Sequence, residues 1–303
     1  MRTIRGKTAW VDVIKPNEAD IAALKKLHGF HPIILDELLH PSPRIRIEHF
    51  DSYLFIVYHL PEYNPELKTS RRTELDFLVT KDKIITIHYE NIPELNTLFD
   101  QLAGDEAQRK TMLGGDSLLL LYEIFERAIA FSLRQLRHIE ERVSFVGQEI
   151  FNSKENEELL KKISYIKRDI LDYRLITHPQ EKFFAQLQEI GHQFWGPKSK
   201  VYLSDLVNEN LPVHRNVDNY FQVIESFETT NAQLLDAETN AIIKKFTVGA
   251  FLFSIPLFFI FAVETKYIGD IFLSSPTVFW TTFSILNALM IGLWFIFKKK
   301  RIV

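Results

Sequence analysis

Residues 246–263, FTVGAFLFSIPLFFIFAV, form an uncharged apolar run in the C-terminal quarter of the chain. Crossing about 30 Å of hydrocarbon takes roughly 20 apolar residues, so this run is a candidate transmembrane span. A second uncharged run covers residues 271–297, and the short, partly polar link ETKYIGD at 264–270 joins the two. Because the link is short, we expect the runs to form a hairpin with both flanks on the same side of a membrane.

Basic residues flank this hairpin on both sides. They are Lys244, Lys245, Lys298, Lys299, Lys300 and Arg301. Lysine and arginine collect on the cytoplasmic side of membranes, so the pattern predicts a multi-pass plasma-membrane protein whose N- and C-termini are both cytoplasmic. We expect the five lysines to form a basic cytoplasmic ring. The alternative is a hairpin buried in a soluble core, but a core helix rarely needs four basic residues directly after its last apolar turn.

Composition excludes several other classes of function. The 303 residues carry a net charge of −3, which gives no support to nucleic-acid binding, and they include no cysteine, which excludes disulfides and thiolate metal sites. The sequence has no Gly-rich phosphate loop, no HExxH and no Gly-x-Ser-x-Gly motif. His28 and His31 are three residues apart, but Gly29 and Pro32 spoil a helical zinc pair. We therefore expect neither an enzyme nor an organic cofactor.

Residues 1–112 are typical of an α+β cytoplasmic domain. Asn17, preceded by Pro16, is a helix N-cap signal. Short apolar runs and turn residues predict strands at 8–14, 53–58, 75–80 and 84–88, and helices at 18–27 and 31–39.

Residues 113–240 are typical of a helical domain. Asp116 caps a helix over 117–151, Asn152 and Ser153 break the pattern, and a second helix is expected from 154 to about 187. Turns are expected at Gly191 and at Gly196-Pro197. A third helix, a stalk over about 199–240, then continues into the transmembrane domain at 241–303, whose spans are expected at about 246–264 and 276–297.

The stalk carries an unbalanced charge. Between residues 205 and 240 the only basic residue is Arg215. The acids over the same range are Asp205, Glu209, Asp218, Glu225, Glu228, Asp236 and Glu238. Single acids on a helix usually form a solvated face, but parallel copies of this helix in an oligomer would concentrate cations along their axis.

One hairpin cannot enclose a water-filled path, so conduction would require several chains. Helical spacing from the end of the stalk gives a candidate pore-lining stripe of small polar and bulky apolar residues. It consists of Asn240, Ile243, Thr247, Phe251, Ser254 and Phe258. Hydroxyl rings alternating with apolar constrictions suit a pore that closes by dewetting. The alternative is that Thr247 and Ser254 bond to carbonyls of their own helix.

Several segments, in order, carry a resemblance to a known family. They are HPIILDELL at 31–39, followed by Pro43-Arg44 and YLFIV at 53–57, VTKDKIITIH at 79–88, YLSD at 202–205, Thr239-Asn240 with Lys244 and Thr247, Pro256-Leu257, and FKKKR at 297–301. The chain resembles the CorA-type family of divalent-cation transporters along almost its whole length.

The resemblance implies a funnel-shaped homopentamer in the lipid bilayer, with the stalk helix continuous with a pore-lining first span. It also implies that divalent ions bind between neighbouring subunits and hold the cytoplasmic funnel closed. The family's regulatory ligands correspond to Glu37, with Asp36 beside it, and to Asp205. Carboxylates with water suit Mg²⁺. Each acid could instead be a solvated or N-terminal-turn residue.

The sequence departs from the family at the outer end of the first span. The family signature there is Gly-Met-Asn, a tripeptide that this chain lacks. Aligned from Pro256, its place holds residues 265–267, and aligned from Asn240 it holds residues 264–266. Because the two registers disagree, no selectivity residue is carried over. Glu264 and Thr265 remain candidates for the outer mouth.

Three functions follow. The first is a channel for divalent cations, most readily Mg²⁺ with Co²⁺, Ni²⁺ or Zn²⁺ as alternatives, in which the ion is both substrate and regulatory ligand. The second is a non-conducting, membrane-anchored divalent sensor or scaffold. The third is a proton-coupled zinc carrier.

Overall fold

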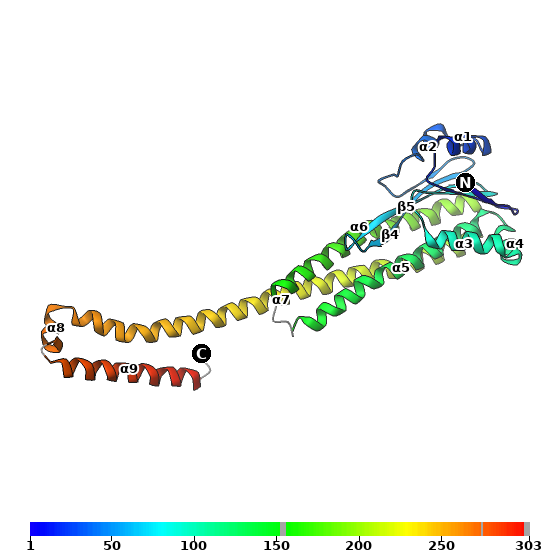
Figure 1. Cartoon of the computed structure of the whole chain (residues 1–303). Helices are drawn as coiled ribbons and strands as arrows, with labels where there is room; N and C mark the ends of the chain where they lie inside the picture. The colour runs from blue at the N-terminus through cyan, green and yellow to red at the C-terminus, as the bar shows by residue number, and fades with distance from the viewer. Residues whose placement is uncertain (152–155, 274, 300–303) are drawn as a thin grey trace. The chain divides into compact units, whose positions relative to one another are not determined.

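A computed structural model of the chain describes residues 1–151, 156–273 and 275–299 (Figure 1). The chain divides into two compact units, Met1–Glu228 and Thr229–Val303, and each is described by itself. The expected break at Asn152-Ser153 and the start of the following helix at Lys154 lie outside the described residues, as does Lys300 of the basic tail.

The first unit is built on one mixed β-sheet. Its strands are β1 (Arg2–Ile4), β2 (Ala9–Ile14), β3 (Arg46–His49), β4 (Leu54–Asn64), β5 (Thr69–Val79) and β6 (Lys83–His88). The order across the sheet is β1-β2-β6-β5-β4-β3. β2 pairs with β6 in parallel and the other pairs are antiparallel. The strands predicted at 75–80 and 84–88 are confirmed as β5 and β6, and they pair as an antiparallel hairpin. Its first strand begins earlier than expected, because β5 pairs with β4 as far as Asn64↔Thr69.

Helices follow and interrupt the strands. They are α1 (Glu18–Leu27), α2 (Pro32–Glu37), α3 (Pro93–Gly104), α4 (Glu106–Leu113), α5 (Ser117–Glu149), α6 (Asn156–Trp195) and α7 (Ser199–Val263). The cap predictions are confirmed. Asn17 Oδ1 accepts hydrogen bonds from the backbone N–H of Ala19 and of Asp20, at 2.9 and 3.0 Å, and Asp20 Oδ2 accepts one from the backbone N–H of Asn17. Asp116 accepts from the N–H of Leu118.

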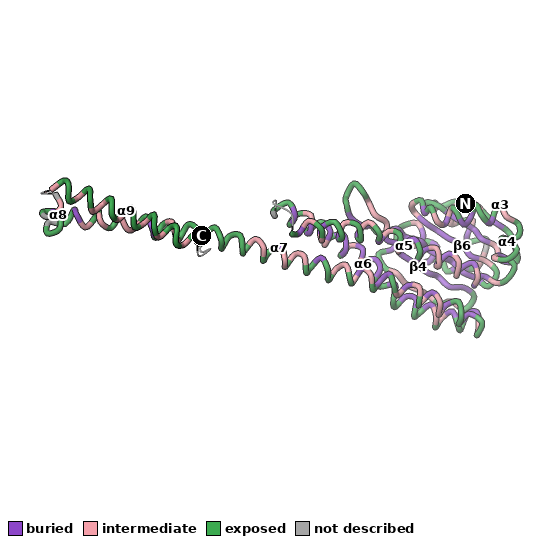
Figure 2. The backbone as a smooth tube through the Cα atoms, turned by 90° about the horizontal axis from the view of Figure 1, so that it is seen from below, coloured by how far each residue is buried: buried purple, intermediate pink, exposed green. Residues whose placement is uncertain are grey.

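The sheet lies between two helical layers (Figure 1). On one face, Leu24 of α1 and Leu35 of α2 pack into an apolar cluster with Val57 and Ile85. On the other face, Tyr58 of β4 contacts Phe125 of α5 at a ring-centroid distance of 5.1 Å and Phe184 of α6 at 5.8 Å. Both faces are therefore buried, which is why the strands read as continuous apolar runs. Figure 2 shows this buried centre in purple.

The predicted turn at Gly191 is wrong, because α6 continues through it to Trp195. The glycine is there for close packing. A Cβ at position 191 would lie 2.3 Å from Cδ1 of Leu203, so its absence lets α6 and α7 approach. The chain turns instead at Gly196, as also predicted, where φ is +82°.

The second unit contains the end of α7, α8 (Lys266–Leu273) and α9 (Pro276–Lys299). Phe259 of α7 contacts Phe272 of α8 at 5.3 Å and Phe279 of α9 at 5.6 Å. The predicted hairpin is therefore present. Its link, however, is not only a loop, because α8 occupies most of it. The sequence analysis treated this link as a short polar connection. Ile268 and Phe272, however, keep a helical spacing of four residues.

Candidate ion pathway and regulatory metal sites

α2 carries the first pair of candidate regulatory carboxylates. Pro32 opens this helix, and Ile34 and Leu35 bury its inner face, which leaves Asp36 exposed and Glu37 partly exposed. Glu37 forms an ion pair with Arg46 of β3. A metal at Glu37 would therefore have to compete with a guanidinium.

Arg46 is held by two carboxylates. Its Nε lies 2.7 Å from Glu48 Oε1, and a terminal nitrogen bonds Glu37. Burial lowers the pKa of the guanidinium, but the bonds to Glu37 and Glu48 outweigh it, so the pKa lies above its usual value. Arg46 therefore stays charged and neutralises the α2 site.

Asp205, near the start of α7, lies in a second acidic group. The Tyr122 hydroxyl of α5 donates a 2.7 Å hydrogen bond to Asp205 Oδ2. Burial and the negative charge of Asp205 raise the pKa of Glu209, one turn further along α7. Burial, followed by Glu123 and Asp205, raises the pKa of Glu126 on α5. These carboxylates repel one another and therefore attract a cation.

Glu37 and Asp205 lie in different layers of the first unit. Glu37 is on the layer formed by α1 and α2, whereas Asp205 contacts α5 on the other side of the sheet. Within the described residues, no three His, Asp or Glu side chains are grouped to hold a metal ion. One chain therefore supplies separate partial sites, and their role as metal ligands stays a prediction.

Several acids of the stalk are neutralised by α6. Asp218 pairs with Arg174 at 3.0 Å. Lys167 pairs with Glu228 at 2.6 Å and lies 3.6 Å from Glu225. The sequence reading counted charges along one helix only, so it overestimated the negative charge of this part of α7. Around Asp205, by contrast, burial and the neighbouring acids raise the pKa values of Glu126 and Glu209.

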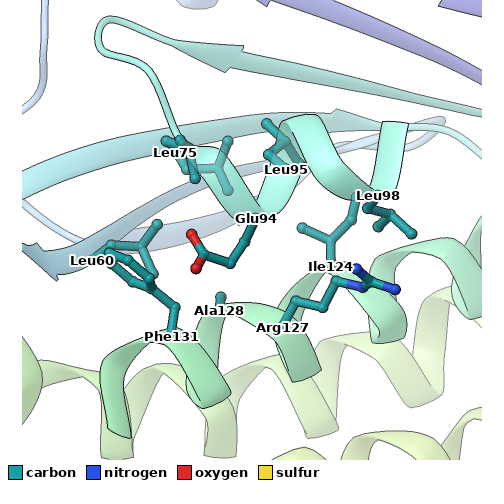
Figure 3. A pocket seen from close by; sticks show the side chains of 10 residues that line it. Leu60, Leu75, Glu94, Leu95, Leu98, Ile124, Arg127, Ala128 and Phe131 are labelled. Carbon is teal, nitrogen blue, oxygen red and sulfur yellow. The ribbon is translucent and has the colours of Figure 1, made fainter. Parts of the chain in front are cut away.

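The first unit also holds a small hollow between α3 and α5, lined mainly by leucine, isoleucine and phenylalanine (Figure 3). Glu94 and Arg127 reach its edge. Glu94 Oε1 accepts a hydrogen bond from Arg134 at 2.6 Å, whereas Glu94 Oε2 is buried without a hydrogen-bond partner, and Arg127 Nε donates to Glu123 at 2.7 Å. Both charged groups form ion pairs, and the rest of the lining is apolar.

The helices of the second unit expose apolar side chains. α7 and α9 are long and apolar enough to span a membrane, with mean hydropathies of 2.3 and 1.6 over their best windows. None of the described residues of α9 is buried within the chain (Figure 2). Exposed apolar surface of this extent requires lipid or other protein around it.

The predicted pore stripe lies on α7. Within the chain, Asn240, Ile243, Thr247, Phe251 and Phe258 are exposed and Ser254 is half-buried. The Ser254 hydroxyl donates to the carbonyl of Phe251 at 2.7 Å. The alternative interpretation of this hydroxyl, a bond to its own helix, is therefore present in the single chain. The stripe itself remains available to neighbours or to a pore.

The outer-mouth candidates lie between α7 and α8. Glu264 is exposed, and the Thr265 hydroxyl donates to the carbonyl of Ala262 at 2.7 Å. At the other ends of the spans, Lys244, Lys245, Lys298 and Lys299 are exposed. Lys298 Nζ lies 5.1 Å from the ring centroid of Trp294. Lysine stems covering an aromatic ring near a helix end are typical of a membrane interface.

Together, these features define a membrane protein with a mixed α/β domain, long helices and a C-terminal pair of spans. Comparison with known proteins agrees. A family model described as "CorA-like Mg2+ transporter protein" matches residues 5–299. The chain belongs to this family of metal ion transporters, whose members are not enzymes.

Individual relatives are distant in sequence and similar in fold. YfjQ of Bacillus subtilis, a protein named for metal ion transport, is 23% identical over 95% of this chain and 88% of its own. The cobalt/magnesium transport protein CorA of Thermotoga maritima is 18% identical over 96% and 82%. The CorA magnesium transporter of Methanocaldococcus jannaschii superposes with a TM-score of 0.79 at 17% identity, covering 96% of this chain and 90% of that one.

Sequence reasoning missed the partners of the candidate ligands. Tyr122, Glu126 and Glu209 surround Asp205, and Arg46 neutralises Glu37. A signal existed for Glu209, which lies four residues after Asp205 on the same helix. Nothing in the sequence linked Asp205 to α5 or Glu37 to β3.

Proposed function

We propose that this protein conducts a divalent cation, most readily Mg²⁺, into the cytoplasm down the membrane potential. One observation carries the proposal. α7 is a single helix from Ser199 to Val263, so it joins the acidic group at Asp205 to the end of the first span. A change in the packing around Asp205 would thus be carried to the span along one continuous helix.

The membrane and the orientation follow from charge. Lys244 and Lys245 precede the first span, and Lys298 and Lys299 end the second. Under the positive-inside rule this places both termini in the cytoplasm, and we assign the protein to the plasma membrane.

We assign the path to an oligomer of identical chains, five according to the family resemblance. The exposed stripe of α7 from Asn240 to Phe258 would line the axis, and α9 would face lipid. Within this arrangement, a hydrated cation passes rings formed by Thr247 and Ser254 and constrictions formed by Phe251 and Phe258.

Gating is assigned to cytoplasmic divalent ions at Glu37, with Asp36, and at Asp205 of a neighbouring copy. Within one chain these carboxylates lie in different layers, so a bridging ion is favoured only between copies. Mg²⁺ usually keeps several waters and uses one or two carboxylates, which suits such partial sites. Loss of the ion leaves the acids facing each other and separates the subunits.

The test is ion uptake by liposomes that contain the full chain and a trapped Mg²⁺-sensitive dye. We expect uptake that rises with an inside-negative potential and falls when Mg²⁺ is also supplied on the side of the large domain. Parallel Co²⁺, Ni²⁺ and Zn²⁺ experiments, with and without a pH gradient, identify the ion and any coupling to protons. Correctly inserted protein without divalent flux would refute conduction.

The second candidate function is a non-conducting divalent sensor. The observation that favours it is that residues 264–267, ETKY, contain no Gly-Met-Asn, the tripeptide that the family carries at this end of the first span. Replacing residues 264–266 or 265–267 by that tripeptide separates the two functions. Transport gained only in the replaced protein would favour a native sensor, whereas transport already present in the native chain would exclude it.

A further inference from the structure

Two carboxylates are buried side by side beneath the segment that joins α2 to β3. Glu74 and Asp76 are alternate residues of β5, so they project from the same face of the sheet. Only 5% of Glu74 and 2% of Asp76 is exposed. Asp76 lies opposite Val57 of β4, and Val57 lies opposite Arg46 of β3, so all three belong to one row across the sheet.

Each carboxylate has one satisfied and one unsatisfied oxygen. Glu74 Oε1 accepts from the backbone N–H of Ser42 at 2.7 Å, and Asp76 Oδ2 accepts from the Tyr89 hydroxyl at 3.2 Å. Glu74 Oε2 and Asp76 Oδ1 are buried and accept no hydrogen bond. The two carboxyl groups are alternate residues on one face of β5, so they are buried next to each other. A proton held by one and donated to the other would satisfy both groups.

The groups that face the pair from neighbouring elements are His59, Tyr89 and Arg46. His59 of β4 places Nε2 3.5 Å from Glu74 Oε2, but that nitrogen also lies 3.1 Å from the Ser42 carbonyl, which only its N–H form can satisfy. From the loop after β6, Tyr89 is neutral and its hydroxyl also lies 3.1 Å from the Leu38 carbonyl. Doubly ionised, the pair would be two adjacent buried carboxylates, which is strongly unfavourable.

The nearest fixed cation is Arg46, and it has other partners. Its nitrogens bond the Ser42 hydroxyl at 2.8 Å, Glu48 at 2.7 Å and also Glu37. Arg46 thus bonds the candidate metal ligand Glu37 and belongs to the same row across the sheet as Asp76. Its positive charge lowers the pKa of Asp76, but burial and the adjacent Glu74 together raise that pKa well above its usual value of 3.8.

We propose that Glu74 and Asp76 form a proton-binding site that holds one shared proton, and that loss of this proton at rising cytoplasmic pH draws Arg46 from Glu37 toward Asp76. The first part stands on the buried geometry alone. The second part rests on the proposed function, because it makes Glu37 a better divalent ligand at higher pH. Proton occupancy thereby sets the divalent concentration at which the gate closes.

The proton itself is tested by infrared spectroscopy of the full chain in detergent, over about pH 5 to 9. Wild type is expected to show the carbonyl band of a protonated, buried carboxyl group that disappears as pH rises. The band should be lost in Asp76→Asn, whose amide can donate to Glu74, and should titrate at lower pH in Glu74→Gln. Glu66→Gln, an exposed carboxylate in the β4–β5 turn, is the matched control and should leave the band unchanged. A wild-type spectrum without the band, or a band that survives in both variants, would overturn the site.

The coupling to Glu37 is tested by the Mg²⁺ concentration that gives half-maximal protection of the full chain from proteolysis. In wild type this Mg²⁺ concentration should fall as pH rises. The pH-dependent change should be smaller in Asp76→Asn by a factor of about five or more, which is the lower end of ordinary coupling between linked sites. Glu66→Gln should behave as wild type. An unchanged pH dependence in Asp76→Asn would overturn the coupling. Wild type without Mg²⁺ protection at any pH would refute the proposed gating, and the coupling with it, while the infrared result still judges the proton site.

Discussion

Replacing Tyr122 by phenylalanine is expected to strengthen Mg²⁺ binding at Asp205. The Tyr122 hydroxyl donates to Asp205 Oδ2 at 2.7 Å, and this bond, together with burial, raises the pKa of the tyrosine. An ion that binds Asp205 must displace or share this donor. The substitution removes the competitor and leaves the ring, which contacts Tyr202 at 5.3 Å, in place.

The size of the effect follows from the bond that is lost. A hydrogen bond to a charged group contributes about 1.5–3 kcal/mol when buried, and both partners here are partly exposed, so we expect about 0.5–1.5 kcal/mol. That free energy corresponds to about a two- to tenfold lower Mg²⁺ concentration at half-saturation. Isothermal titration calorimetry of the full chain in detergent measures it directly.

Two variants make this measurement interpretable. Tyr202→Phe removes a hydroxyl from the neighbouring ring without changing the Tyr122–Asp205 bond, so its affinity should equal that of wild type. Asp205→Asn should weaken binding strongly. If Tyr122→Phe bound Mg²⁺ more weakly than wild type, the hydroxyl would be supporting the ion rather than competing with it. If affinity were unchanged, Asp205 would not be a ligand.

Further predictions concern packing and pH. Asp169 is fully buried and accepts hydrogen bonds from Ser70, His138 and Arg142. Asp169→Ala should therefore lower the free energy of unfolding, measured in urea, by about 3–5 kcal/mol, whereas Asp172→Ala, at a more exposed position, should lower it by about 1 kcal/mol or less. Equal losses in the two variants would contradict this. Gly191→Ala should cost about 1–3 kcal/mol in the same assay, because its Cβ meets Leu203, and a neutral result would disprove the close packing. The pKa values of Glu126 and Glu209 are raised above 4.5, so their contribution to stability is fully present below that pH and is lost as pH rises through the raised values. Mg²⁺ affinity should rise over the same pH interval, which calorimetry at several pH values measures. An affinity that does not change with pH would contradict this.

Local signals predicted much of the first unit. Asn17 with Asp20, and Asp116, are side chains that satisfy free N–H groups within their own first helical turn, so they could be identified without knowing the fold. Short apolar runs at 75–80 and 84–88, with turn residues between them, predicted the two strands of the central hairpin from local sequence alone. The edge strands β1 and β3 were not predicted, because a strand of three or four residues has too little pattern to distinguish it from a loop.

Features set by tertiary packing could not be predicted. Gly191 looked like a turn, since glycine is more frequent in turns than in helices, and only the position of Leu203 explains it. Glu37 and Asp205 came from motif resemblance, but their partners Arg46 and Tyr122 lie on other elements. Asp76 reads as an ordinary polar residue of a strand. Its burial beside Glu74 is visible only once β4, β5 and the Ser42 loop are in place.

The central claim is that several copies of this chain share one axis and that α7 of each copy lines the path. The most direct test is the mass of the assembled protein in lipid nanodiscs, measured with and without Mg²⁺. We predict a closed assembly of identical chains, five in number, that is more compact and more resistant to dissociation when Mg²⁺ is present. A single chain per nanodisc under both conditions would contradict the pore and the bridging ion together.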